Sequence, residues 1–255
     1  MKEVRNRLAI LISIAVIGLT GCSSSEEEER EMLANQGVTA LYEQAKRNMD
    51  NGNFAAAAEV LSSIDSRFPF GPLSHQVQLD LIYSYYKSGN SDQALATIDR
   101  FVRLNPNHAD VDYALYMRGV TNMEQDANLF QSLMNVERDD RDPSKSKEAF
   151  EDFRRLIEKY PDSKYAVDAK QRMLAIKNRL AKYEIEVARF YMRREAYVAA
   201  ANRGRYVLEH YPDTPQIRPA LEIMVASYDE LGLDDLRDNA VKTLRLNFPD
   251  SEFIR

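Results

Sequence analysis

Hydrophobic residues between positions 76 and 87 recur at the spacing of an amphipathic helix. The residues on one face of this segment are Val77, Leu81, Ile82 and Tyr85. This spacing predicts an α-helix that buries that face. Gly89 then turns the chain, and residues 92–104 form a second helical segment that Pro106 ends, because proline cannot continue a helix. The stretch therefore predicts two helices joined by a short turn.

The same succession of turn, small residue and proline recurs along the chain. Two units have a glycine, an alanine five positions later and a proline twelve positions after that, and the other units keep part of this frame. The residues are Gly52, Ala57 and Pro69; Gly89, Ala94 and Pro106; Ala149 and Pro161; Ala200 and Pro212; and Gly232 and Pro249. The small residue lets two helices approach closely, and glycine adopts the conformation that a short turn needs. The repeat predicts an array of helical hairpins.

This frame resembles the tetratricopeptide repeat, and the resemblance extends over residues 37–255. It implies an all-α fold, a superhelical solenoid of about five helical hairpins. We expect the hairpins at about 37–70, 75–107, 112–162, 163–213 and 214–250. A repeat of this kind indicates the architecture strongly and the function weakly.

The third hairpin is expected to carry an insertion at residues 124–142. Its first helix is predicted at residues 113–123 and its second after Pro143, with Asp142 as the N-cap. An insertion of this length is usually functional or mobile. It either folds over its own array or contacts another lipoprotein.

The fourth hairpin is expected to contain extra helix. Ser163 is predicted to cap a helical run that ends near Arg194 and breaks near Lys182. Glu195 stands where other units have a turn glycine. In the fifth unit, Thr214 followed by Pro215 predicts an N-cap and a helix start.

The first 21 residues have the pattern of a signal peptide, with basic residues before an apolar run from Leu8 to Leu19. That run is too short to span a bilayer comfortably. The small residues before Cys22, the chain's only cysteine, resemble the lipobox of bacterial lipoproteins. This implies removal of residues 1–21 and acylation of Cys22, and Ser23 after it favours the outer membrane. The alternative is an incidental cysteine after an ordinary signal peptide. Residues 22–36 are expected to be an acidic, flexible tether.

An aromatic groove is predicted in the first two hairpins. Placing the chain on the repeat puts Tyr42, Met49, Leu79, Tyr83 and Tyr86 on the concave face, with Phe70 in the adjoining link and Arg67 and Lys87 at the rim. Such a groove suits an extended peptide that ends in an aromatic residue and a carboxylate. The alternative is that the aromatic stripe belongs to the core.

Six ordered blocks make the resemblance more specific. They are RFPFGP at 67–72, QVQLDLIYSYYK at 76–87, RLNP at 103–106, YMRGVTNM at 116–123, DRDP at 140–143 and RLAKYE at 179–184. They resemble the tetratricopeptide-repeat lipoproteins of the outer-membrane β-barrel assembly machinery. The resemblance implies a non-enzymatic adaptor at the periplasmic face of the outer membrane. Its partners would be the periplasmic domains of the barrel insertase, smaller lipoproteins and the carboxy-terminal signals of unfolded barrel proteins.

Positive charge gathers around residues 189–205 in an otherwise acidic chain, whose formal net charge is -6. We expect Arg194, Arg203 and Arg205 at the insertase interface, because the carboxy-terminal repeats of the resembled family dock there. The alternative is a solvated face paired with local carboxylates. The acidic balance excludes a general nucleic-acid-binding role.

Candidate chemistry is absent from the sequence. His75, His108 and His210 stand apart, and the nine glycines occur singly, so we expect no metal site, no cofactor and no enzyme activity. The competing hypothesis is a periplasmic repeat lipoprotein that coordinates cell-wall synthesis or division. The six blocks favour the assembly role.

Overall fold

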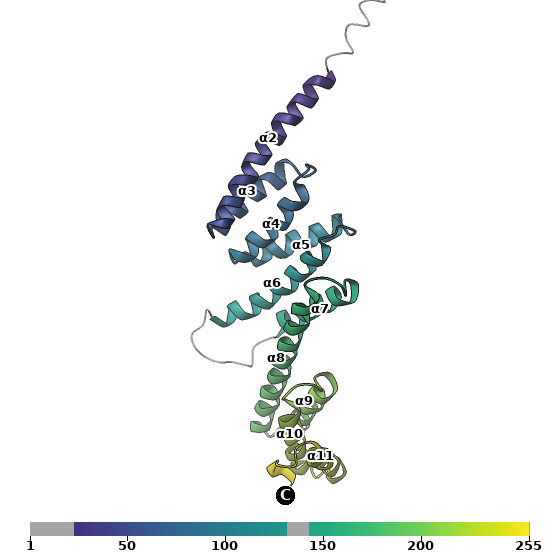
Figure 1. Ribbon diagram of the computed structural model, residues 1–255. Helices are drawn as coiled ribbons and strands as arrows, with labels where there is room; N and C mark the ends of the chain where they lie inside the picture. The colour runs from purple at the N-terminus through teal and green to yellow at the C-terminus, as the bar shows by residue number, and fades with distance from the viewer. Residues whose placement is uncertain (1–22, 132–142, 255) are drawn as a thin grey trace, which may run out of the picture. The chain divides into compact units, whose positions relative to one another are not determined.

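A computed structural model describes the backbone of residues 23–131 and 143–254, and the side chains of residues 37–125 and 143–254 (Figure 1). The helices of the amino-terminal part are α2 Ser23–Asp50, α3 Phe54–Arg67, α4 Ser74–Lys87 and α5 Ser91–Leu104. Those that follow are α6 Val111–Gln131, α7 Ser144–Lys159, α8 Ala166–Arg193, α9 Tyr197–His210, α10 Ile217–Glu230, α11 Asp234–Asn247 and the 3-10 turn η1 Glu252–Ile254. The described residues form no strand, so the predicted all-α repeat fold is confirmed.

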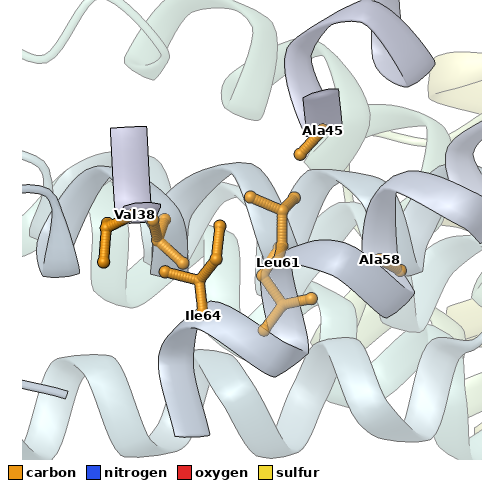
Figure 2. Close-up of a cluster of buried hydrophobic side chains, with 7 residues drawn as sticks. Val38, Ala45, Ala58, Leu61 and Ile64 are labelled. Atoms are coloured by element: carbon orange, nitrogen blue, oxygen red, sulfur yellow. The ribbon is translucent and has the colours of Figure 1, made fainter. Parts of the chain in front are cut away.

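The chain divides at Gly89 into two compact units. In the first, α2 packs on α3 and α3 packs on α4. Figure 2 shows part of its core, where Val38 and Ala45 of α2 meet Leu61 and Ile64 of α3. These four side chains are at most 4% exposed. The predicted buried face of α4 is confirmed as well, because Val77, Leu81 and Ile82 are buried and Tyr85 packs on the core.

The second unit runs from Asn90 to the end of the chain. Within this unit, each helix from α5 to α10 packs on the helix that follows it in the sequence. The alanines of the repeat frame are fully buried between packed helices. Ala94, Ala149 and Ala200 have no exposed surface, and neither does Ala57 in the first unit. Gly119 and Gly204 allow equally tight contacts, since an added Cβ would lie 2.6 Å from the Phe153 ring and 2.8 Å from the Ala220 carbonyl oxygen.

Left-handed residues lie in four of the turns between successive helices. Gly52, Gly89 and Gly232 have φ of 74°, 78° and 65°. Glu195 has φ of 57° and is the only non-glycine residue with positive φ in the described chain. The prediction that Glu195 occupies a glycine position is therefore confirmed. A side chain in this conformation is strained by contact between its Cβ and the backbone.

Two successive β-turns, the first of which contains Pro69, Pro106, Pro161 or Pro212, lead into the next helix at four places. The Ser163 N–H donates to the Tyr160 carbonyl, and the Ala166 N–H donates to the Ser163 carbonyl, both at 3.0 Å. Thr214 lies in the same kind of turn, where its Oγ1 donates to the Tyr211 carbonyl at 2.8 Å. Both residues were predicted as helix caps, and both predictions are wrong. Their hydroxyls stabilise the turn, and the helices begin three residues later.

Other predicted boundaries also differ from the structure. Helix α6 continues to Gln131, beyond the predicted end at residue 123, and the rest of the predicted insertion, including Asp142, lies outside the described residues. Pro143 is the N-cap of α7 rather than its first residue. Helix α8 is unbroken at Lys182, because apolar residues on both sides of it, such as Leu180 and Ile185, stay on the buried face.

The residues predicted as a flexible tether are helical from Ser23 onward, where they form the first half of α2. Glutamates occupy positions 26–29 and 31. Glutamate is a good helix former, and negative charge near the amino terminus of a helix is favoured by the helix dipole. Cys22 and the predicted signal peptide lie outside the described residues.

The strained turn at Glu195 gives a test of the fold. We predict that Glu195→Gly raises the free energy of unfolding by about 0.5–1 kcal/mol, because glycine adopts positive φ without Cβ strain. Urea unfolding of the full chain in detergent, followed by circular dichroism, measures the change. The matched control is Gly89→Glu, which should lower stability. A Glu195→Gly variant that is no more stable than the parent contradicts the account of this turn.

Candidate functional site

Two of the aromatic residues predicted for the groove, Tyr83 and Tyr86, lie near the end of α4, beside the start of α3. Tyr83 packs edge-to-face on Phe54, with ring centroids 5.6 Å apart and planes at 85°. Tyr86 lies 6.5 Å from Tyr83, and the Lys87 Nζ lies 5.6 Å from the centre of the Phe54 ring. We call these four residues the Tyr83 cluster. Its three rings are half-buried and Lys87 is exposed, so the cluster offers both apolar surface and a cation.

Tyr42 of α2 contributes to the fold through its hydroxyl. The Tyr42 hydroxyl donates to Asp80 Oδ2 at 2.6 Å, and Gln76 Nε2 donates to Asp80 Oδ1 at 3.1 Å. Burial and the bond to Asp80 raise the pKa of the Tyr42 phenol. Tyr42 and Met49 both pack against the core of the first unit. They are half-buried, so both residues contribute to that core.

Leu79 was predicted to line the groove, and its burial contradicts this. It is 6% exposed, and residues 77–82 of α4 are all buried, polar ones included. A helix that is buried on most of its circumference leaves little free surface. The polar side chains in this stretch are paired, as where Gln78 Nε2 donates to Asp65 Oδ1 at 3.0 Å. Leu79 is a core residue.

Arg67 and Phe70 lie apart from the Tyr83 cluster. Arg67 ends α3 and Phe70 lies in the link that leads into the start of α4, whereas Tyr83 and Tyr86 lie near the end of α4. The 14 residues of α4 span about 20 Å at 1.5 Å per residue. Phe70 is 96% exposed. The structure therefore divides the predicted groove residues between two ends of one helix.

Arg203 of α9 pairs with a buried carboxylate of α8. Its Nη1 donates to Glu184 Oε2 at 2.8 Å; the Glu184 side chain is 4% exposed and that of Arg203 is 41% exposed. The bond to Glu184 raises the pKa of the Arg203 guanidinium. Arg203 thus has a structural role, while the outer part of its guanidinium still faces solvent.

The other two predicted interface arginines make exposed contacts. Arg205 Nη2 donates to Asn202 Oδ1 at 2.9 Å and lies 3.9 Å from Glu209. The Arg194 guanidinium lies 5.2 Å from the centre of the Phe190 ring, which is 44% exposed. These arginines remain accessible on α9 and at the end of α8.

Sequence reasoning missed Phe54 and Glu184. Phe54 follows the turn at Gly52 and begins α3, which faces the last turn of α4 in an antiparallel pair. The sequence does contain a signal for this pair. An aromatic residue that directly follows a turn is expected to contact an aromatic residue at the end of the next helix. Glu184 lies in the block RLAKYE beside apolar Ile185, and a carboxylate on the buried face of a helix requires a cationic partner.

The residues that the structure describes contain no group of three or more His, Cys, Asp or Glu side chains that could hold a metal ion. They also contain no helix with the length and hydropathy of a candidate membrane span.

Comparison with known proteins adds an independent observation. The model of the family described as "YfiO: Outer membrane lipoprotein" matches residues 34–244. The chain is 47% identical over 234 residues to "Outer membrane protein assembly factor BamD" of Vibrio cholerae, covering 92% of this chain and 95% of that protein. Proteins of the same name from Neisseria meningitidis serogroup A and Pasteurella multocida are each 36% identical. The Neisseria alignment covers 96% of this chain and 93% of the relative. The Pasteurella alignment covers 92% of this chain and 89% of the relative.

The pair of Arg203 and Glu184 gives a stability test. We predict that Arg203→Met lowers the free energy of unfolding by about 2 kcal/mol, because it leaves the buried Glu184 carboxylate without its partner. Adding Glu184→Gln should restore most of this loss. Arg205→Met is the matched control and should change stability by less than about 0.5 kcal/mol, since its partners are exposed. Equal effects of Arg203→Met and Arg205→Met in urea unfolding would contradict a structural role for Arg203.

Proposed function

The chain belongs to the YfiO family of outer membrane lipoproteins, and from this premise we propose that it is an outer membrane protein assembly factor that works as an adaptor. In this proposal Cys22 carries the lipid that holds the protein at the periplasmic face of the outer membrane. The Tyr83 cluster binds the carboxy-terminal segments of unfolded barrel proteins. The surface around Arg203 docks on the periplasmic domains of the barrel insertase, and smaller lipoproteins bind elsewhere on the array.

The Tyr83 cluster is the observation that carries the substrate-binding proposal. Phe54 and Tyr83 hold each other in an edge-to-face pair, so their rings are oriented before a ligand arrives. Aromatic pairs of this kind contribute about 0.5–1.5 kcal/mol beyond the area that they bury. A ligand's aromatic side chain can extend the pair, while the Lys87 ammonium, which lies over Phe54, attracts a terminal carboxylate. Polypeptide ends with both groups match this surface.

The docking proposal is supported by how Arg203 is held. Its bond to Glu184 fixes the guanidinium on α9 and leaves 41% of the side chain exposed. A guanidinium has five N–H donors, so a partner carboxylate can still bind it. The restraint also lowers the side-chain entropy that Arg203 loses on binding. Arg194 and Arg205 add positive charge along the same stretch of chain.

The lipid anchor is supported by the lipobox-like residues before Cys22 and by membership of a family of outer membrane lipoproteins. Acylation by several chains gives stable membrane attachment, which a single chain does not. Helix α2 follows directly at Ser23.

We predict that Tyr83→Ala combined with Tyr86→Ala weakens binding of a peptide ending in phenylalanine by more than about 1 kcal/mol, or at least fivefold in Kd. Fluorescence anisotropy with the full chain in detergent measures the affinity, and circular dichroism checks the helical content. Phe70→Ala is the matched control, because it removes an exposed ring at the other end of α4. An unchanged affinity for the double variant, with an intact helical spectrum, excludes the cluster as the binding site.

The docking surface is tested by capturing the chain from solubilised outer membranes through a carboxy-terminal tag. We predict that the Arg203→Met, Glu184→Gln double variant, which keeps the fold without the charge, recovers at least about fivefold less barrel insertase than the parent does. Arg154→Met serves as a control at an exposed arginine of α7, whose partners Glu151 and Glu158 are also exposed. Normal recovery with the double variant removes Arg203 from the interface. Recovery of cell-wall synthases instead of a barrel protein from the parent chain contradicts the assembly role.

A further inference from the structure

Two adjoining hollows open on the α10–α11 hairpin, the last two helices labelled in Figure 1. The wide hollow, of about 550 Å³, lies between α10, α11 and η1. The narrow slot, of about 220 Å³, lies between α8 and α10. Ala226 and Phe253 line both. The Phe253 side chain therefore forms a ridge between two sites that a single ligand can occupy together.

The ridge is held in place by the residues around it. Ile254, the next residue, packs into the core formed by α10 and α11. The Phe253 N–H donates to Ser251 Oγ at 3.4 Å, and the Ser251 hydroxyl donates to Glu222 Oε1 at 2.8 Å. Phe253 nevertheless remains 44% exposed. An anchored and partly exposed ring beside two hollows is a preformed feature, so a ligand loses little free energy in ordering it.

The narrow slot suits an apolar side chain. Met192, Pro219, Ile223, Ala226 and Phe253 supply most of its lining, and Arg189 and Glu222 complete it. A cavity of about 150 Å³ lined by apolar side chains is known to hold a benzene molecule, so a slot of about 220 Å³ holds one large aliphatic or aromatic side chain. Such a side chain gains the free energy of leaving water.

The wide hollow has an acidic rim. Arg237, which lines it, contacts Asp229, Asp234 and Asp238 at 3.0, 2.7 and 3.0 Å. One guanidinium thus faces three carboxylates, and Glu230 lines the same hollow. Arg245 adds the second positive charge, which leaves carboxylates in excess. The lining also has an apolar part, which includes Val225 and Val241. The surface therefore attracts a cation on a carbon stem, which describes lysine and arginine.

We propose that the two hollows bind an extended segment of a partner protein in which a large apolar side chain enters the slot and a nearby lysine or arginine reaches the acidic rim. Alternate side chains of an extended segment point to the same side about 6.8 Å apart, which suits two hollows separated by one ring. This inference rests on the proposed adaptor function in one respect, namely that the ligand is a polypeptide. The residues that line the hollows include neither Arg203 nor any member of the Tyr83 cluster.

The probe is a fluorescein-labelled synthetic peptide with the central sequence Leu-Ser-Lys, tested by anisotropy against the full chain in detergent. Two matched peptides replace the lysine by glutamate or the leucine by alanine. We expect the Leu-Ser-Lys peptide to bind at least about tenfold more tightly than either, and added salt to reduce that difference for the glutamate peptide. Equal binding of all three peptides overturns the proposal.

Variants then place the binding site. Ala226→Phe fills both hollows and should abolish binding, whereas Ala175→Phe, at an exposed position of α8, should leave it unchanged. Asp229→Asn with Asp238→Asn, a change confined to the exposed rim, should reduce the preference for lysine over glutamate at least about fivefold. Undiminished binding to the rim variant or to Ala226→Phe overturns the proposal. Binding of the phenylalanine-ended peptide to the Tyr83 cluster, measured in parallel, should not change, so the two proposals fail separately.

Discussion

Close approach of antiparallel helices at buried alanines is the constraint on which the array depends. Ala57, Ala94, Ala149 and Ala200 have no exposed surface, and each is succeeded twelve positions later by the proline of its unit. A larger side chain at such a crossing would separate the helices and remove the packing around it. Gly119 and Gly204 extend the same constraint to points where a Cβ would meet a ring or a carbonyl oxygen.

That constraint also positions the candidate site. Because α3 runs back along α4, its first residue, Phe54, meets the last turn of α4 and forms the edge-to-face pair with Tyr83. The same antiparallel arrangement leaves Phe70 and Arg67 at the other end. A binding surface in this fold is therefore assembled from the start of one helix and the end of the next, close to a left-handed turn residue.

The repeat frame was predictable from sequence because it consists of local rules. A turn needs positive φ, a crossing needs a small side chain, and proline ends a helix, so Gly89, Ala94 and Pro106 each indicate their own role. The place of Glu195 in the frame identified it as a turn residue at a glycine position, and its positive φ of 57° agrees with that role. The helix boundaries at Ser163 and Thr214 were mispredicted because a hydroxyl stabilises a β-turn as well as a helix start. Only the backbone groups that it contacts, the Tyr165 N–H for Ser163 and the Tyr211 carbonyl for Thr214, decide between them.

The site was less predictable, since its chemistry depends on contacts between distant residues. Tyr83 and Tyr86 were recognised from helical spacing, but the burial of Leu79 depends on what packs against α4, and the spacing of one helix does not contain this information. Phe54 became part of the site only through its pairing with Tyr83. Arg203 was recognised as a candidate, yet its bond to Glu184, nineteen residues earlier, gives it a structural role that sequence alone did not indicate.

Photo-cross-linking of substrate in cells tests the central claim, that the Tyr83 cluster receives the ends of unfolded barrel proteins. A photoreactive phenylalanine analogue would replace Tyr86, or Val167 on the exposed face of α8 as the reference position, and newly made barrel proteins would be labelled and irradiated. The account predicts adducts from position 86 that involve the carboxy-terminal segment of the substrate and disappear when that segment is deleted. No adduct at position 86, or equal adducts at positions 86 and 167, would contradict it.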